Sequence, residues 1–148
     1  MLSRYQWALE KALPDVRGTL EWLDQAGFTV TDSRGGEHEG FGNVFLQFQR
    51  TDMGVRITRD RGQWFCDISP PGRPDYLGLH VLLTAKESGE PDPGHRITAF
   101  SQPLAEQLPK GVGWQSVVPS LIVWLEEADR TGSISDADHL WREAMKRY

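Results

Sequence analysis

Residues 43–69 read NVFLQFQRTDMGVRITRDRGQWFCDIS, and this stretch decides the fold. Apolar and polar side chains alternate within it in three short runs. A period of two places neighbouring side chains on opposite faces of a β-sheet, and β-branched and aromatic residues suit that surface. The side chains expected on the packed face are those of Val44, Leu46, Phe48, Val55, Ile57, Trp64, Cys66 and Ile68.

Turn-forming residues separate the three runs. They occupy Thr51–Gly54 and Asp60–Gly62. We therefore predict a three-stranded antiparallel meander with one packed face and one wetter face. Phe28–Thr31 is expected to add a further strand, so the predicted sheet extends over about residues 28–69.

Helices are predicted before the sheet. Ser3, with Gln6 three residues later, forms a capping box that predicts a helix beginning near Arg4. Pro14 is well placed as the first residue of a second helix, which Gly27 ends.

Two connections interrupt the pattern of helices and strands. Residues 33–42, SRGGEHEGFG, predict a loop because four of the ten are glycines. After the meander, prolines force an irregular connection, and residues 75–86 fit either a helix or a fourth strand of the sequence LHVLL.

The last third predicts helices. An apolar stripe at helical spacing runs from Trp114 to Ala128, with Ser116 as the expected cap, Pro119 in the first turn and Gly132 as the stop. A final helix is expected over residues 136–148. The predicted fold is α+β: N-terminal helices, a small antiparallel meander, and C-terminal helices packed on one sheet face.

Composition narrows the class of protein. A chain of 148 residues is expected to form a single domain, residues 1–148. Sixteen Lys and Arg against 21 Asp and Glu give a net charge of −5 with no basic stripe, which argues against a nucleic-acid partner. The chain has no signal sequence and no long apolar run, so no membrane partner is expected. A single cysteine cannot form a disulfide within the chain, which is what we expect of a protein in the reducing cytoplasm.

Few residues of the sequence are candidates for catalysis or for metal binding. Cys66 needs a nearby base and a lowered pKa to act as a nucleophile, and its phase with Trp64 and Ile68 predicts a core position instead. His38 lies between Glu37 and Glu39, but this spacing is typical of a solvated acidic loop rather than a metal site. No catalytic residue, metal or cofactor is therefore expected.

Charged side chains gather in two places. Residues 126–138 contain five acids and one base, Arg130. The acids on the outer face of the predicted helix are Glu126, Glu127 and Asp129. The turns and polar face of the meander carry basic residues that are expected to pair with nearby aspartates. The basic residues are Arg50, Arg56, Arg59 and Arg61, and the aspartates are Asp52, Asp60 and Asp67.

The hairpin VRITRDRGQW, from Val55 to Trp64, resembles small bacterial immunity proteins from polymorphic-toxin loci. In these proteins such a hairpin precedes a helical C-terminal half. The resemblance covers about a third of the chain and transfers no binding residue. It implies a non-enzymatic cytoplasmic protein that binds one cognate toxin domain and blocks it.

The sequence therefore leaves three functions open. The first is an immunity protein, a monomer or weak homodimer when free, that neutralises a toxin domain such as a nuclease. The second is an adaptor or secretion chaperone that engages a client protein, and the third is a small enzyme using Cys66 or the 37–39 loop. The residues expected to contact the toxin are Glu37, His38, Glu39, Glu126, Glu127 and Asp129.

Overall fold

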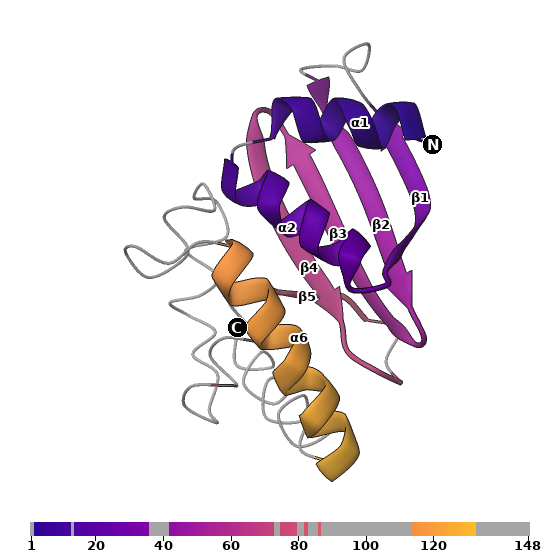
Figure 1. The fold of residues 1–148 in the computed structure, drawn as a ribbon, viewed down its shortest axis with the longest axis vertical. Helices are drawn as coiled ribbons and strands as arrows, with labels where there is room; N and C mark the ends of the chain where they lie inside the picture. Colours follow the sequence, from indigo (N-terminus) through magenta and orange to yellow (C-terminus); the bar gives the residue numbers. More distant parts are fainter. Residues whose placement is uncertain are drawn as a thin grey trace, which may run out of the picture.

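A five-stranded antiparallel sheet forms the centre of the protein, with its strands side by side in chain order (Figure 1). The computed structural model describes residues 2–12, 14–35, 42–72, 75–79, 82, 86 and 114–132. The strands are β1 (Thr29–Gly35), β2 (Val44–Arg50), β3 (Met53–Asp60), β4 (Gln63–Ser69) and the short β5 (Leu77–Gly78).

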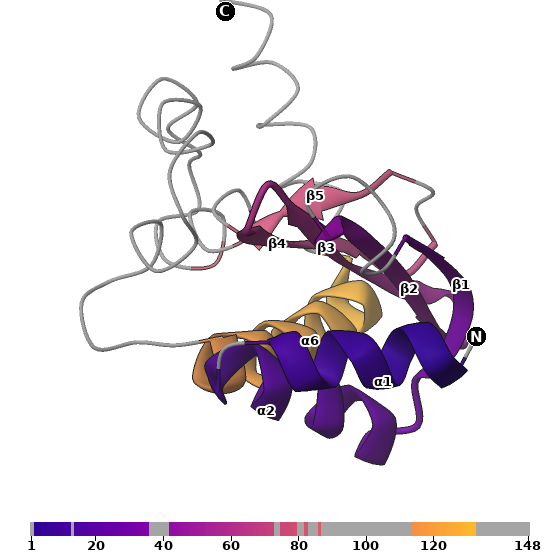
Figure 2. The same ribbon diagram turned by 90° about the horizontal axis from the view of Figure 1, so that it is seen from above.

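Three helices cover one face of this sheet. They are α1 (Leu2–Lys11), α2 (Pro14–Gln25) and α6 (Trp114–Thr131). Figure 2 shows all three on the same side of the strands, with α6 beside α2 and α1 beside the β1–β2 end of the sheet. The predicted α+β architecture is therefore confirmed. Within the described part of the chain, none of the helices combines the length and the hydropathy needed to cross a bilayer.

The alternation predicted for the meander is confirmed. Every side chain expected on the packed face is buried, while the intervening side chains of β2 and β4 are only partly buried. The packed face meets an equally apolar stripe on α6, and this stripe contains all the positions predicted for it. The buried residues of α6 are Trp114, Val117, Val118, Leu121, Ile122, Leu125 and Ala128.

The two hairpins turn through left-handed backbone. Thr51 has φ 49°, and Arg61 and Gly62 have φ 53° and 82°. Two-residue connections of this kind match the right-handed twist of the strands, so they set the register of β2 against β3 and of β3 against β4. Gly54, expected in the first turn, lies in β3 instead. A Cβ atom there would come 2.3 Å from the Tyr76 hydroxyl oxygen, so only glycine admits that contact.

Strand β1 is longer than predicted. The loop was expected to start at Ser33, but Ser33 pairs with Leu46 and Arg34 with Phe45, so the strand continues to Gly35. A register shift between Val30 and Asp32 is what keeps this pairing in phase. The 36–41 part of the predicted loop lies outside the described residues.

Two predicted helix starts are wrong. Leu2 is already helical, so Ser3 lies inside α1 rather than capping it. Helix α6 begins at Trp114 instead of after Ser116, which leaves Pro119 inside the helix and beyond its first turn. Trp114 is fully buried, and burying an indole outweighs the gain from a serine cap. The other expected ends are confirmed, with Pro14 first in α2 and Gly27 and Gly132 after the helices at φ 91° and 82°.

The helix alternative for residues 75–86 is supported at the described positions, whereas the strand predicted at LHVLL, residues 79–83, is wrong because a two-residue strand lies just before it. Leu77 and Gly78 pair with Ile68 and Asp67 as β5. Leu79, Leu82 and Lys86 are helical, and both leucines are buried. The helix predicted over residues 136–148 lies outside the described part of the chain.

We predict that Trp64 is a main anchor of the packed face. Its side chain is only 4% exposed, and truncation of a buried Trp to Ala costs about 3–5 kcal/mol in the free energy of unfolding. The measurement is denaturant unfolding of Trp64→Ala. Val123→Ala is the control, because this 62% exposed valine should change stability by no more than about 0.5 kcal/mol. Equal stability of the two variants would contradict the burial of Trp64.

Candidate functional site

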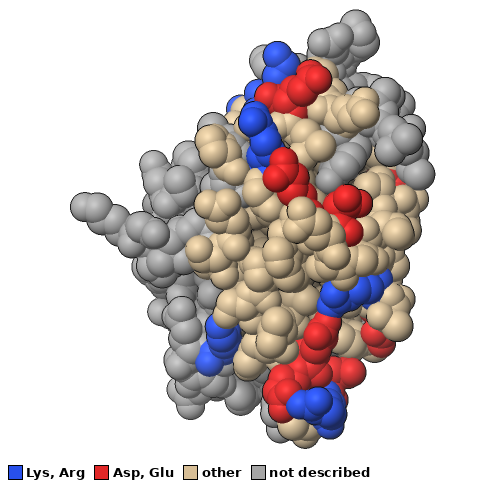
Figure 3. Space-filling view, in the orientation of Figure 1, with Lys and Arg blue, Asp and Glu red and all other residues tan. Residues whose placement is uncertain are grey.

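The predicted acidic residues of α6 lie on its outer face. Glu126, Glu127 and Asp129 are all exposed. Figure 3 shows carboxylates gathered around the C-terminal end of this helix, with basic side chains among them. Glu127 forms an ion pair with Arg130, one turn along the helix. The surface is therefore acidic but partly neutralised.

A second base, absent from the local sequence, reaches this surface from the sheet. Arg50, at the end of β2, forms an ion pair with Glu126. Its guanidinium also donates to the Ala26 carbonyl oxygen at 2.8 Å and lies 4.5 Å from the centre of the Phe28 ring. Arg50 was expected to pair with an aspartate of the meander. Instead it joins α6 to the end of α2, so Glu126 helps to hold the helix in place.

Val123 adds an apolar side chain to the same face. It is the one large apolar side chain that is exposed among the described residues. Glu126 and Glu127 follow it by three and four positions, which places them beside it on a helix surface. A protein interface combines apolar contact with a polar rim, so we consider these side chains together. We call Val123, Glu126, Glu127 and Asp129 the α6 patch.

The other predicted contact residues are not brought to the α6 patch by any described contact. Glu37, His38 and Glu39 lie outside the described residues. In the sequence they lie between Gly35, the last residue of β1, and Val44, the first residue of β2.

Cys66 occupies the predicted core position on β4. Its side chain is 3% exposed, and burial raises the pKa of the thiol well above its ordinary value, with the negative charge of Asp67 adding to the rise. The nucleophilic thiolate is therefore disfavoured. In the part of the chain that the structure describes, no three His, Cys, Asp or Glu side chains are grouped so that they could hold a metal ion.

We predict that Cys66 reacts with a thiol reagent only when the protein opens. The native protein should label slowly at neutral pH and the denatured protein rapidly, because burial both shields the sulfur and raises its pKa. Labelling followed by mass spectrometry measures both rates. Native labelling as fast as denatured labelling would contradict the core position.

The outer face of the sheet carries a row of alternating arginine and aromatic side chains. We call it the Arg–aromatic row: Arg34, Phe45, Arg56 and Tyr76. The Arg34 guanidinium lies 4.4 Å from the centre of the Phe45 ring, and the Arg56 guanidinium lies 5.5 Å from Phe45 and 3.7 Å from Tyr76. Sequence reasoning missed this row, although Phe45 in the outward phase of β2 was a signal for it.

Arg56 is held at the centre of this row. Its Nε donates to Gln47 at 3.2 Å, and Asp67 lies opposite it on β4. Burial raises the pKa of the Asp67 carboxyl, and the positive charge of Arg56 offsets only part of that rise. The pKa of Tyr76 is raised for the same reason, with Arg56 again opposing the effect of burial. Arg56 and Asp67 face each other across β3 and β4 and attract, but these two described side chains form no ion pair, so the predicted pairing of the meander's arginines with its aspartates is not found here.

We predict that Asp67 makes the protein less stable as the pH rises. Its pKa is higher in the folded than in the unfolded protein, so folding favours the protonated form. Stability should therefore fall between the ordinary carboxyl pKa of about 3.9 and the raised folded value. Asp67→Asn should remove this part of the pH dependence in unfolding experiments, and Asp52→Asn in the β2–β3 turn controls for the lost carboxylate. A pH profile that Asp67→Asn leaves unchanged would contradict the prediction.

Comparisons with known proteins add no information about these surfaces. No protein-family model, no curated protein and no solved structure matches the chain.

Proposed function

We propose that this chain is an immunity protein, which binds a bacterial toxin domain and neutralises it without catalysing a reaction. The observation that carries the proposal is the α6 patch, in which the exposed Val123 lies beside Glu126 and Glu127, with the exposed Asp129 further along the helix. The resemblance of the Val55–Trp64 hairpin to immunity proteins supplies the class of partner. In this proposal the protein acts in the cytoplasm and is a monomer or weak homodimer when free.

The chemistry of the patch suits a basic substrate cleft. Nucleases and other enzymes that act on phosphates bind them with Lys and Arg, and an acidic surface can occupy that cleft in place of the substrate. The net charge of −5 adds a long-range attraction that would speed the encounter. Val123 would contribute apolar contact at the centre of the surface.

The ion pair between Arg50 and Glu126 prepares the patch for binding. It adds a charged contact to the buried apolar stripe that holds α6 in place, so little ordering of the helix remains to be done when the partner arrives. Glu127 and Asp129 are not part of that contact. They are therefore the acids whose change should affect binding without affecting the fold.

Buried Cys66 supports a non-enzymatic role. It was the leading candidate nucleophile in the sequence, and the structure gives its thiol neither access nor a lowered pKa. The proposal therefore rests on binding rather than on chemistry at this residue.

We predict that reversing two charges of the patch slows association with the toxin domain encoded beside this protein. Glu127→Lys combined with Asp129→Lys should lower the association rate constant about tenfold or more at low salt, because attraction between the surfaces steers the encounter. The parent rate should also fall as salt increases. Rapid-mixing kinetics with the purified toxin domain measures both effects.

The matched control changes the same net charge elsewhere. Glu10→Lys combined with Glu21→Lys alters two exposed acids of α1 and α2 and should slow association much less. Equal slowing by both double variants would show a general effect of net charge and contradict the placement of the site on α6.

Expression in cells tests the function itself. The parent protein should protect cells from the toxin domain encoded beside it and leave unrelated toxins active. Failure to protect, with no complex formed between the purified proteins, would reject the immunity function. A complex in which the toxin keeps its full activity would favour the adaptor or chaperone function.

A further inference from the structure

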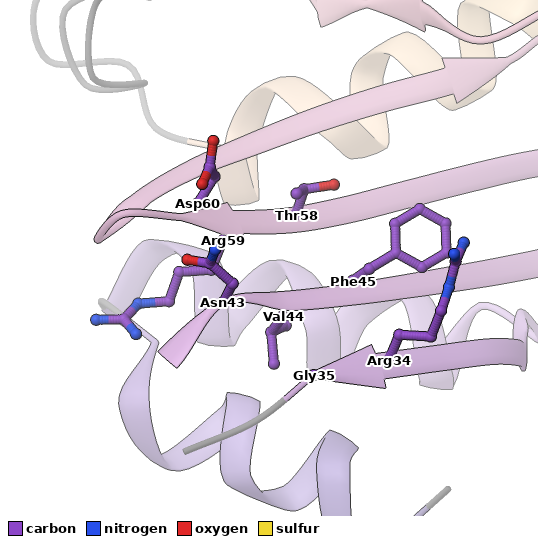
Figure 4. A pocket seen from close by; sticks show the side chains of 8 residues that line it. All are labelled: Arg34, Gly35, Asn43, Val44, Phe45, Thr58, Arg59 and Asp60. Carbon is purple, nitrogen blue, oxygen red and sulfur yellow. The ribbon is translucent and has the colours of Figure 1, made fainter. Parts of the chain in front are cut away.

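An open pocket of about 320 Å³ lies at the end of the sheet where β1 stops and β2 starts. It is lined by the ends of β1, β2 and β3 (Figure 4). None of its lining residues belongs to the α6 patch, and Val44 is the one lining residue that the packed face also includes. Its position at one end of the Arg–aromatic row makes it a second candidate for partner recognition.

The pocket has an apolar middle with opposite charges on its two sides. Figure 4 shows Arg34, Phe45, Thr58 and Asp60 projecting to the same side of the sheet, with Phe45 and Thr58 between the two charged residues. Arg34 pairs with Phe45 and Phe45 with Thr58, so Arg34 and Thr58 lie two strand spacings apart, about 10 Å. Asp60 follows two residues later on the same face. The cation and the anion are therefore separated by on the order of 10 Å.

The Arg34 guanidinium has one ring contact and one weak ion pair, which leave donors available to a ligand. Its guanidinium is stacked on Phe45, which fixes the plane of the donors. Its ion pair with Asp32 uses Nε at 3.4 Å, and the two side chains are 67% and 45% exposed. Exposed pairs of this kind are weak in water, and the pair leaves the terminal guanidinium nitrogens to donate elsewhere.

The second arginine of the lining does not add to this charge. Figure 4 shows Arg59 projecting away from Phe45 and Thr58. Its Nη1 donates to the Gly42 carbonyl oxygen at 2.9 Å, and its guanidinium lies 5.8 Å from the Trp7 ring. The open side of the pocket therefore presents one positive and one negative side chain, rather than a general anion site.

We propose that this pocket receives a surface segment of the partner protein that carries an acidic and a basic side chain on the same side of an extended chain. The carboxylate contacts Arg34, the cation contacts Asp60, and the aliphatic stem of the basic side chain covers Phe45. Alternate residues of an extended chain are about 7 Å apart, and flexible side chains span the rest of the distance. The inference rests on the proposed function, since it assigns a second contact to the same partner.

Two probes test the pocket, and the first needs no toxin. Isotope-labelled protein is titrated with the blocked tripeptides acetyl-Lys-Leu-Glu-amide and acetyl-Glu-Leu-Lys-amide, with acetyl-Gln-Leu-Gln-amide as the uncharged control. Saturable shifts of the Asn43, Phe45 and Thr58 amide signals are expected with at least one charged peptide and not with the control. The second probe is the purified toxin domain, with its dissociation rate as the readout.

Single variants decide the result. Arg34→Gln and Asp60→Asn should each weaken binding of the probe, or speed its dissociation, by about two- to fivefold, because each removes one partner of an exposed charge pair. Asp52→Asn, in the turn at the other end of β3, is the matched control and should have no such effect. The amide spectra of all variants establish that the fold is unchanged.

The outcomes separate this inference from the proposed function. If the parent binds a charged peptide and both pocket variants lose it, the pocket assignment stands even when no toxin complex forms. If the toxin complex forms and both variants dissociate like the parent, the pocket assignment is overturned while the immunity function stands. A parent protein that binds neither probe overturns both.

Discussion

The alternation of buried and partly buried side chains along β2, β3 and β4 is the constraint on which the rest of the structure depends. It gives the sheet one face that must be covered, and α1, α2 and α6 cover it with their own apolar stripes. The opposite face is not covered by these three helices, and it carries the Arg–aromatic row. A period of two therefore separates the face that the helices cover from the face that carries this row.

Two neighbouring residues of β4 show how this alternation sets the surroundings of a side chain, and through them its pKa. Cys66 points into the core, where burial suppresses its thiolate, while Asp67 points outward to Arg56. Arg50 works across the layers, because its ion pair with Glu126 joins the end of β2 to α6. The same contact that secures the helix presents the acids beside Val123, so the proposed binding surface is part of the folded framework rather than an addition to it.

Local patterns predicted most of the described fold, and long-range pairing accounts for what they missed. The strand phases, Pro14 and the apolar stripe of α6 depend on nearest neighbours, so they could be predicted from the sequence. The extension of β1 to Gly35 depends on pairing with β2, and the contact of Arg50 with Glu126 joins residues far apart in the chain. Neither has a local signal. Of the predicted contact residues, the three acids of α6 lie on one helix. The pocket could not be predicted, because its lining comes together only through the pairing register of three strands.

Neutralisation of a toxin domain, as proposed for this protein, requires that the bound protein block the active site of the toxin. The most direct measurement is the activity of the toxin domain as this protein is added in known amounts. The account predicts a linear loss of activity that is complete at about one equivalent, with both proteins recovered chemically unchanged from the complex. Loss of activity at far less than one equivalent would show that this protein acts as a catalyst. Full activity at an excess of this protein would contradict neutralisation altogether.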